Sequence, residues 1–397
     1  MKPIILTTFL LAAQLHARPL QVFILAGQSN MQGHAKISTF EHIGMDPATK
    51  PMLDEMLGAD GKPKVCERVW ISSIGCAGDD TTEQTGKLTA GFGATKEKIG
   101  PEFTFGLTMQ KITDAPILLI KTAWGGKSLN TDFRPPSAGP YVFNETQLAN
   151  LQKQGKDIAA IKAVKEKETG VYYRLMIEHV KKVLGDFKRV VPGYDASQGY
   201  ELAGFAWFQG WNDMVDGGTY PNRDKPGGYD AYSSVMAHFI RDVRKDLNTP
   251  KLPFVIGVLG VGGPTSEYGP DQQRYKATHD HFRAAMAAPA SLPEFKGNVA
   301  TVLAEKYWDR ELTLAKSKDN AIKEKVKKLA KEGKMKPAEE RALMDTMRTG
   351  GLTERERLVL EKGISNLEFH YLGSAKILGG VGKGLAEALA ELKELRK

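Results

Sequence analysis

The chain has 397 residues, of which 41% are hydrophobic and 26% are charged, and its formal net charge is +8. This is the composition of an ordinary globular protein, long enough for one large domain with insertions or for two domains. The charge does not indicate nucleic acid, because the lysines crowd into residues 316–336 without interleaved aromatic residues. We interpret them as a solvated helical face, with nonspecific attraction of an acidic polysaccharide as the alternative.

The first 17 residues have the features of a secretory signal. Lys2 precedes an apolar stretch over residues 3–13, and Ala17 is the small residue after which we expect cleavage. The alternative is a buried first strand or helix. No later segment has 18 consecutive apolar residues, so we expect no membrane span and a secreted or periplasmic protein.

Five short apolar segments, most of them ending at glycine, predict buried strands, and amphipathic helices alternate with them. The predicted strands are residues 20–26, 116–122, 202–208, 254–259 and 298–303, and the predicted helices are residues 102–112, 172–184, 232–247, 274–286 and 374–392. This alternation indicates a parallel sheet in a three-layer α/β/α sandwich, where functional groups gather at the carboxyl ends of the strands.

Two segments do not follow the alternation. Residues 129–168 contain two proline-rich turns and predict a long loop over the carboxyl edge of the sheet. Residues 309–365 are rich in lysine, glutamate, alanine and leucine and predict a charged helical insertion. The main domain is then made of residues 18–308 and 366–397.

The only two cysteines, Cys66 and Cys76, flank a short strand candidate. A hairpin would bring them within bonding distance, and two buried free thiols are the alternative. No Cys/His cluster suggests a metal site, and we expect neither a metal nor an organic cofactor.

The first predicted strand runs into residues 27–31 (GQSNM), which place Ser29 on a tight turn. A serine in that position exposes its hydroxyl, as a nucleophile requires. The second and third strands run into residues 124–128 (WGGKS) and 210–213 (GWND). A glycine amide and an asparagine side chain beside Ser29 would supply the N–H donors that acyl transfer needs.

A general base must reach the serine. Of the eight histidines, His370 alone immediately precedes a helix at the far end of the chain. A histidine in a loop before a helix can approach the nucleophile, as triad geometry requires.

These four blocks, in this order, resemble those of the SGNH hydrolases, whose fold is flavodoxin-like. The likeness is greatest to the sialate O-acetylesterase-like carbohydrate acetylesterases, because residues 27–31 read GQSNM and the third block follows residues 207–210 (WFQG). The resemblance implies Ser29 as nucleophile and His370 as base. It implies an oxyanion hole made of the Ser29 amide, a glycine of the pair Gly125 and Gly126, and the Asn212 side chain.

One position departs from the family pattern, which usually has aspartate three residues before the histidine. Here that residue is Leu367. Asp309, after the fifth strand, replaces it if residues 309–365 are an insertion, and we prefer it because a strand end holds a side chain well. Glu368 is the alternative acid, and a serine–histidine dyad is the third possibility.

The implied activity is that of a serine carboxylic-ester hydrolase, which removes O-acetyl groups from an oligo- or polysaccharide through an acetyl-serine. We expect the substrate to contact Gln28, Trp124, Arg134, Gln209 and Trp211. The tryptophans would stack on sugar faces or lie in the core, and Arg134 would hold a sugar carboxylate or sulfate or pair with a surface acid. The rival interpretations are a carbohydrate-binding pseudoenzyme and a lipid or aryl esterase. The sequence sets no oligomeric state.

Overall fold

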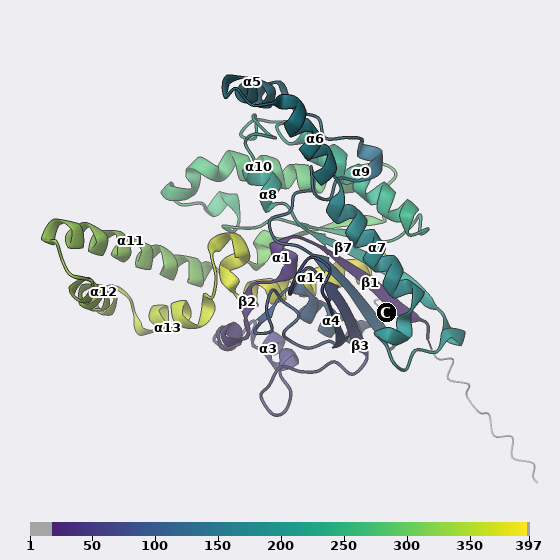
Figure 1. Cartoon of the computed structure of the whole chain (residues 1–397). Helices are drawn as coiled ribbons and strands as arrows, with labels where there is room; N and C mark the ends of the chain where they lie inside the picture. Colours follow the sequence, from purple (N-terminus) through teal and green to yellow (C-terminus); the bar gives the residue numbers. More distant parts are fainter. Residues whose placement is uncertain (1–17, 395–397) are drawn as a thin grey trace, which may run out of the picture.

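The computed structural model describes residues 18–394 (Figure 1). The predicted signal segment, residues 1–17, lies outside the described residues. The strands are β1 Leu20–Gly27, β2 Ala35–Lys36, β3 Val69–Ile74, β4 Glu83–Lys87, β5 Lys98–Ile99, β6 Ile117–Ala123, β7 Tyr200–Phe208, β8 Phe254–Val258 and β9 Val299–Leu303. The α-helices are α1 Ser29–Gln32, α2 Phe40–Gly44, α3 Lys50–Met56, α4 Pro101–Ile112, α5 Glu145–Lys153, α6 Ile158–Glu168, α7 Val171–Gly185, α8 Trp211–Val215, α9 Asp230–Asp246, α10 Gln273–Ala287, α11 Arg310–Gly333, α12 Pro337–Gly351, α13 Glu354–Gly363 and α14 Ala375–Leu392.

Seven strands form one sheet in the order β4-β3-β6-β1-β7-β8-β9. All neighbours are parallel except β4, which pairs antiparallel with β3 at the edge. The predicted parallel sheet is confirmed, with this added edge strand. Sequence reasoning missed β4 because its residues are polar and partly exposed, so no apolar run marks it.

Helices cover both faces of the sheet, so the predicted three-layer fold is confirmed (Figure 1). On β7, Gly204 faces Leu389 of α14, whereas the next residue, Phe205, contacts Phe239 of α9. Successive residues of a strand point to opposite faces, so α14 and α9 belong to opposite layers. α4 packs against α14 on its side of the sheet.

The carboxyl ends of the three central strands are level with one another. Gly27, the last residue of β1, pairs with Ala123 of β6 and with Phe208 of β7. A side chain at position 27 would lie 2.2 Å from the Phe208 carbonyl oxygen, so only glycine allows the strands to approach there. The residues that follow these three strands therefore emerge at one place.

The two segments outside the alternation both contain helices. Residues 129–168, predicted as a long loop, include α5 and α6, which lie above the sheet in Figure 1. The helices α11, α12 and α13 extend away from the sheet at one side (Figure 1). Both cysteines are buried free thiols, because Cys66 and Cys76 lie at opposite ends of β3 instead of across a hairpin. Within residues 18–394, no helix is long and apolar enough to cross a membrane.

Candidate active site

The turn that carries Ser29 is fixed by backbone hydrogen bonds. Ser29 is the first residue of α1, so its N–H is among those that a helix leaves without an internal acceptor. The N–H groups of Met31 and Gln32 both donate to the Gln28 carbonyl at 2.8 Å, and the Gln28 N–H donates to Phe208 at 3.4 Å. The predicted nucleophile is 8% exposed, on a turn that its neighbours hold in place.

The side chain of Gln28 connects this turn to the third block. Its Oε1 accepts from the Gly210 N–H at 3.0 Å, and its Nε2 donates to Asn212 Oδ1 at 2.8 Å. Because the Gly210 N–H can only donate, the Gln28 amide has one orientation, and Asn212 must accept with its oxygen. The Asn212 NH₂ group therefore remains available as a donor at the carboxyl end of β7.

The second block lies against the turn of Ser29. A methyl group built on Gly125 would come within 4.0 Å of Ser29 Cβ and 3.0 Å of Gln32 Oε1. The next residue, Gly126, adopts φ +74°, a left-handed conformation that suits glycine. Gly125 therefore adjoins the serine, and a larger residue there would crowd the Gln32 side chain.

Asp213 joins the second block to the third. Its buried carboxylate accepts from the N–H groups of Leu129 and Asn130, at 2.8 and 3.0 Å, and from Gln209 and Tyr220. Burial raises the pKa of Asp213 to about 6, and its four donors oppose the rise. This carboxylate holds the loop after β6 against the loop after β7.

A buried ion pair, which sequence reasoning missed, holds the end of the Ser29 turn from the core side. Lys121 of β6 and Glu102 of α4 are fully buried and 2.7 Å apart. The Lys121 ammonium also donates to the carbonyl oxygens of Gln32 and Phe92, at 2.8 and 2.7 Å. A lysine within an apolar strand was the available signal, but its partner is on a helix earlier in the chain.

His370 lies in the short 3₁₀ segment Glu368–Gly373, between the last two helices. Its Nδ1 is 2.9 Å from Asn366 Oδ1, an oxygen that also accepts from the Leu367 N–H at 2.7 Å. Since that oxygen can only accept, Nδ1 carries the proton and Nε2 has a free lone pair. Burial, assisted by the charge of Lys98, lowers the pKa of His370 to about 4.

Two rings enclose the imidazole. His34 stacks on His370 with the ring centroids 4.0 Å apart, and Phe369 meets it edge-on at 4.4 Å. Burial, with the nearby positive charges, lowers the pKa of His34 to about 3, so this ring is neutral at neutral pH. Sequence reasoning missed both His34 and Asn366, although His34 comes only five residues after Ser29 and Asn366 directly precedes the position of the usual aspartate.

The expected contact between Asp309 and His370 is not formed. Asp309 caps α11 by accepting from the Leu312 N–H at 2.8 Å, and its other oxygen lies 2.6 Å from the Lys376 ammonium. Asp309 does not end a strand, because β9 stops at Leu303 and a 3₁₀ turn follows, and its carboxylate caps the helix that starts there. The alternative acid, Glu368, pairs with Lys316 at 2.7 Å. Among the described residues, the partner of His370 Nδ1 is an amide.

Four of the five expected substrate contacts are engaged within the protein. Gln28 and Gln209 are fully buried, and Trp124 is 1% exposed with its indole donating to the Asp80 carbonyl at 2.9 Å. The guanidinium of Arg134 donates to backbone carbonyls of its own loop and to one amide oxygen. These side chains are held by contacts within the protein, and their contact with a substrate stays a prediction.

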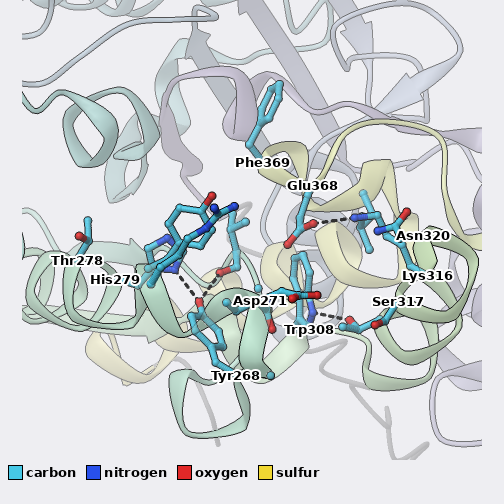
Figure 2. A pocket seen from close by; sticks show the side chains of 18 of the residues that line it. Tyr268, Asp271, Thr278, His279, Trp308, Lys316, Ser317, Asn320, Glu368 and Phe369 are labelled. Atoms are coloured by element: carbon cyan, nitrogen blue, oxygen red, sulfur yellow. Dashed lines mark hydrogen bonds and ion pairs between the residues drawn. The ribbon is translucent and has the colours of Figure 1, made fainter. Parts of the chain in front are cut away.

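Trp211 is the exception. It is half-buried, stacks on Phe369 with the centroids 5.7 Å apart, and borders a cavity of about 1030 Å³. Figure 2 shows this cavity, with Phe369 among its labelled residues. The described residues contain no group of three or more His, Cys, Asp and Glu side chains placed to hold a metal ion.

Three solved structures resemble the chain in fold. A protein of Arabidopsis thaliana is 19% identical with a TM-score of 0.39, over 72% of this chain and 86% of that one. A carbohydrate acetylesterase from Xanthomonas citri is 14% identical with a TM-score of 0.38, over 71% of this chain and 49% of that one. NanS is 12% identical with a TM-score of 0.39, over 72% of this chain and 78% of that one. No curated sequence matches the chain.

The family comparison covers all three strand-end blocks. The model of the carbohydrate esterase family described as sialic acid-specific acetylesterase matches residues 19–306. The match ends before α11, so α11 to α13 and the loop of His370 lie beyond it. A family match over most of the chain supports carbohydrate acetylesterase activity, and the chain belongs to this carbohydrate esterase family.

Proposed function

We propose that the chain hydrolyses acetyl esters of carbohydrates through an acetyl-serine intermediate. The Nε2 of His370 takes the proton of Ser29, whose oxygen attacks the acetyl carbonyl. The proton then passes to the sugar oxygen as the C–O bond breaks. Water gives a proton to His370 and attacks the acetyl-serine, and acetate leaves as Ser29 regains its proton.

The oxyanion of each tetrahedral intermediate would be held by N–H donors from three strand ends. These donors are the Ser29 amide, an amide of the glycine pair Gly125 and Gly126, and the NH₂ of Asn212. The hydrogen bond from Gln28 to Asn212 carries the proposal, because it leaves that NH₂ as a free, fixed donor at the edge where Ser29 lies. Donors fixed before the reaction are worth more than donors that must reorient.

Asn366 takes the place of the usual acid as a positioning residue. It holds His370 in the tautomer with Nδ1 protonated, which is the geometric part of the acid's role. An amide does not stabilise the imidazolium as a carboxylate would, in keeping with the low pKa of His370. The missing aspartate is thus compatible with an enzyme and does not require a pseudoenzyme.

The test is hydrolysis of p-nitrophenyl acetate and of acetylated saccharides. We expect Ser29→Ala to abolish activity, His370→Ala to be nearly as severe, and the double variant to be no worse than either, because residues that act as a unit are not additive. Ser291→Ala, at an exposed serine, is the control. A folded Ser29→Ala variant with unchanged turnover would exclude the acetyl-serine, and a wild type that binds sugar without releasing acetate would favour a binding protein.

The proposal includes export. The charged, apolar and small-residue pattern of residues 1–17 supports a signal that is removed after Ala17. Mass spectrometry of the protein recovered from the periplasm or medium of an expressing bacterium would identify the new N-terminus. A full-length chain retained in the cytoplasm would contradict it.

A further inference from the structure

The cavity beside Trp211 lies next to the candidate active site but has no role in the chemistry proposed above. Its lining includes residues that follow β7, β8 and β9, such as Trp211, Val261 and Trp308, and residues of α10 and α11. In Figure 2, His279 of α10 stands on one side, Lys316 and Asn320 of α11 stand on the other, and Phe369 stands between them. Its volume of about 1030 Å³ is at the upper end of the ~300–1000 Å³ range of small-molecule sites.

One face of α11 forms a wall of this cavity. The lining residues of the helix recur at three- and four-residue spacing, and they are Thr313, Lys316, Ser317, Asn320, Ala321 and Glu324. All but Ala321 are polar. A different face of the helix, with Leu312, Ala315 and Val326, is buried. The helix α11 is therefore amphipathic: its apolar face packs against the protein, and its polar face lines the cavity.

The cavity adjoins the reacting groups through one aromatic pair. Trp211 directly precedes Asn212, Phe369 directly precedes His370, and the two rings stack on each other. Both rings also line the cavity. The pair therefore borders the cavity with residues that adjoin Asn212 and His370 in the chain.

The lining has aromatic faces and no net charge. Trp308 is partly exposed, Tyr275 is 45% exposed, and such faces suit the C–H side of a sugar ring. The charged lining residues are three cations and three acids: Arg223, Arg274, Lys316, Asp271, Glu324 and Glu368. Lys316 is paired with Glu368.

The two arginines have partners within the protein. Arg223 donates to the Val215 carbonyl, and Arg274 lies over the ring of Tyr275. The three cations of the described lining are matched in number by its three acids, so the lining offers no net positive charge to an anionic ligand. Burial lowers the pKa of His279 to about 4, so this ring adds no charge at neutral pH.

We propose that this cavity binds the sugar units that adjoin the acetylated one, and that its ligand is an uncharged oligosaccharide held in part by α11. The proposal rests on the function proposed for Ser29 and His370. On this proposal α11, which lies beyond the family match, helps to determine which length and which charge of oligosaccharide the protein prefers.

The experiment compares O-acetylated xylo-oligosaccharides from monomer to tetramer, with p-nitrophenyl acetate as a measure of the chemistry alone. We expect kcat/KM of the wild type to rise from monomer to tetramer by about tenfold or more, the equivalent of ~1.4 kcal/mol of added binding. Asn320→Trp, which fills the cavity from α11, should remove most of the increase in kcat/KM from monomer to tetramer. Lys325→Trp, an exposed position of α11 outside the lining, is the matched control and should keep it.

An equal kcat/KM for monomer and tetramer, or an unchanged ratio in Asn320→Trp, would overturn the proposal. A preference for acetylated oligogalacturonides over the neutral series would overturn the uncharged ligand. Failure of the proposed function is distinguishable, because the wild type would then release acetate from no substrate. In that case, calorimetry of Ser29→Ala with unacetylated xylotetraose still tests the cavity. Binding that Asn320→Trp weakens would support the proposed sugar site, and an absence of binding would refute it.

Discussion

The two sides of the candidate site are held in different ways. On the side of Ser29, the three strand ends are joined by buried hydrogen bonds through Gln28 and Asp213, above the buried pair of Lys121 and Glu102. On the side of His370, the contacts are a side-chain amide, stacked rings and a partly exposed ion pair. One side is part of the core, whereas the other is a loop supported by neighbouring helices.

This difference matches what each side has to do in the proposed reaction. Oxyanion donors act only if they are in place before charge develops, so they benefit from a rigid, buried network. The base needs the correct tautomer and a fixed ring, which one hydrogen bond and two flanking rings provide. Variants on the two sides should therefore fail in different ways.

The largest difference should be in stability. The pairs Lys121–Glu102 and Lys316–Glu368 have the same 2.7 Å distance, but the first is fully buried and the second is 26% and 43% exposed. Glu102→Ala leaves a buried ammonium unpaired and should lower the free energy of unfolding by about 3–5 kcal/mol. Glu368→Ala should cost about 0–1 kcal/mol. Urea unfolding measures both, and equal losses would refute the contrast.

The next effect is on turnover. Asn212→Ala should lower kcat by roughly a hundredfold or more with little change in KM, as expected for a donor used only in the transition state. Asn150→Ala, on the exposed part of α5, is the control. Gln28→Ala should also lower kcat, by about tenfold, because Asn212 then loses its orientation. An increase in KM alone would instead make Asn212 a substrate-binding residue.

The His370 side should respond to pH. With a pKa of about 4, His370 is the neutral base at all higher pH values, so kcat/KM should fall only as the pH drops toward 4. Asn366→Asp places a negative charge against the ring, favours the imidazolium and raises its pKa, by about one unit or more. The acidic limb of the pH profile should shift upward accordingly. A limb that does not move would show that Asn366 does not contact the catalytic imidazole.

The smallest effect should come from Asp309, the acid that the sequence favoured. Asp309→Asn can still cap α11, and it loses the ion pair with Lys376 and the 3.8 Å contact with His42. Because Lys376 keeps Asp46 as a partner at 2.9 Å, no charge is left unpaired and the cost should be on the order of 1 kcal/mol. We expect kcat to stay within about twofold, because the residue orients no catalytic group. A loss of orders of magnitude in a folded variant would restore Asp309 to the triad.

The strand ends on the Ser29 side could be predicted, but the side chains that join them could not, and the His370 side could be predicted only in part. Apolar runs that end in glycine are local signals, and parallel strands bring such ends together, so the three blocks were found without any long-range information. The partner of His370 depends on a turn in which Tyr371 and Leu372 adopt φ +53° and +60°. Non-glycine residues seldom take this conformation, and no sequence pattern marks it.

Asn366 was missed for this reason. The sequence does not mark Leu372 as a special residue. Its left-handed backbone lets its carbonyl accept from the N–H groups of Ser365 and Asn366, at 2.9 and 3.0 Å. That closes the loop and brings the Asn366 side chain to the imidazole. The pair of Lys121 and Glu102 was missed for another reason: a lysine within an apolar strand is a signal, but no linear pattern identifies its partner on a helix.

Both ends of the three-helix segment meet at one side chain, His42. Its imidazole lies 3.8 Å from the Asp309 carboxylate at the start of the segment, and a methyl on Gly363 at the end would touch it. A segment with adjacent ends can be gained or lost in evolution by a single insertion or deletion. Here it also packs Leu312 and Val359 against Leu372 in the loop of the base. If α11 binds sugar as proposed, a lineage that exchanged these three helices would change its sugar preference, and the replacement would have to refill the space over Leu372 to keep the loop of His370 in place.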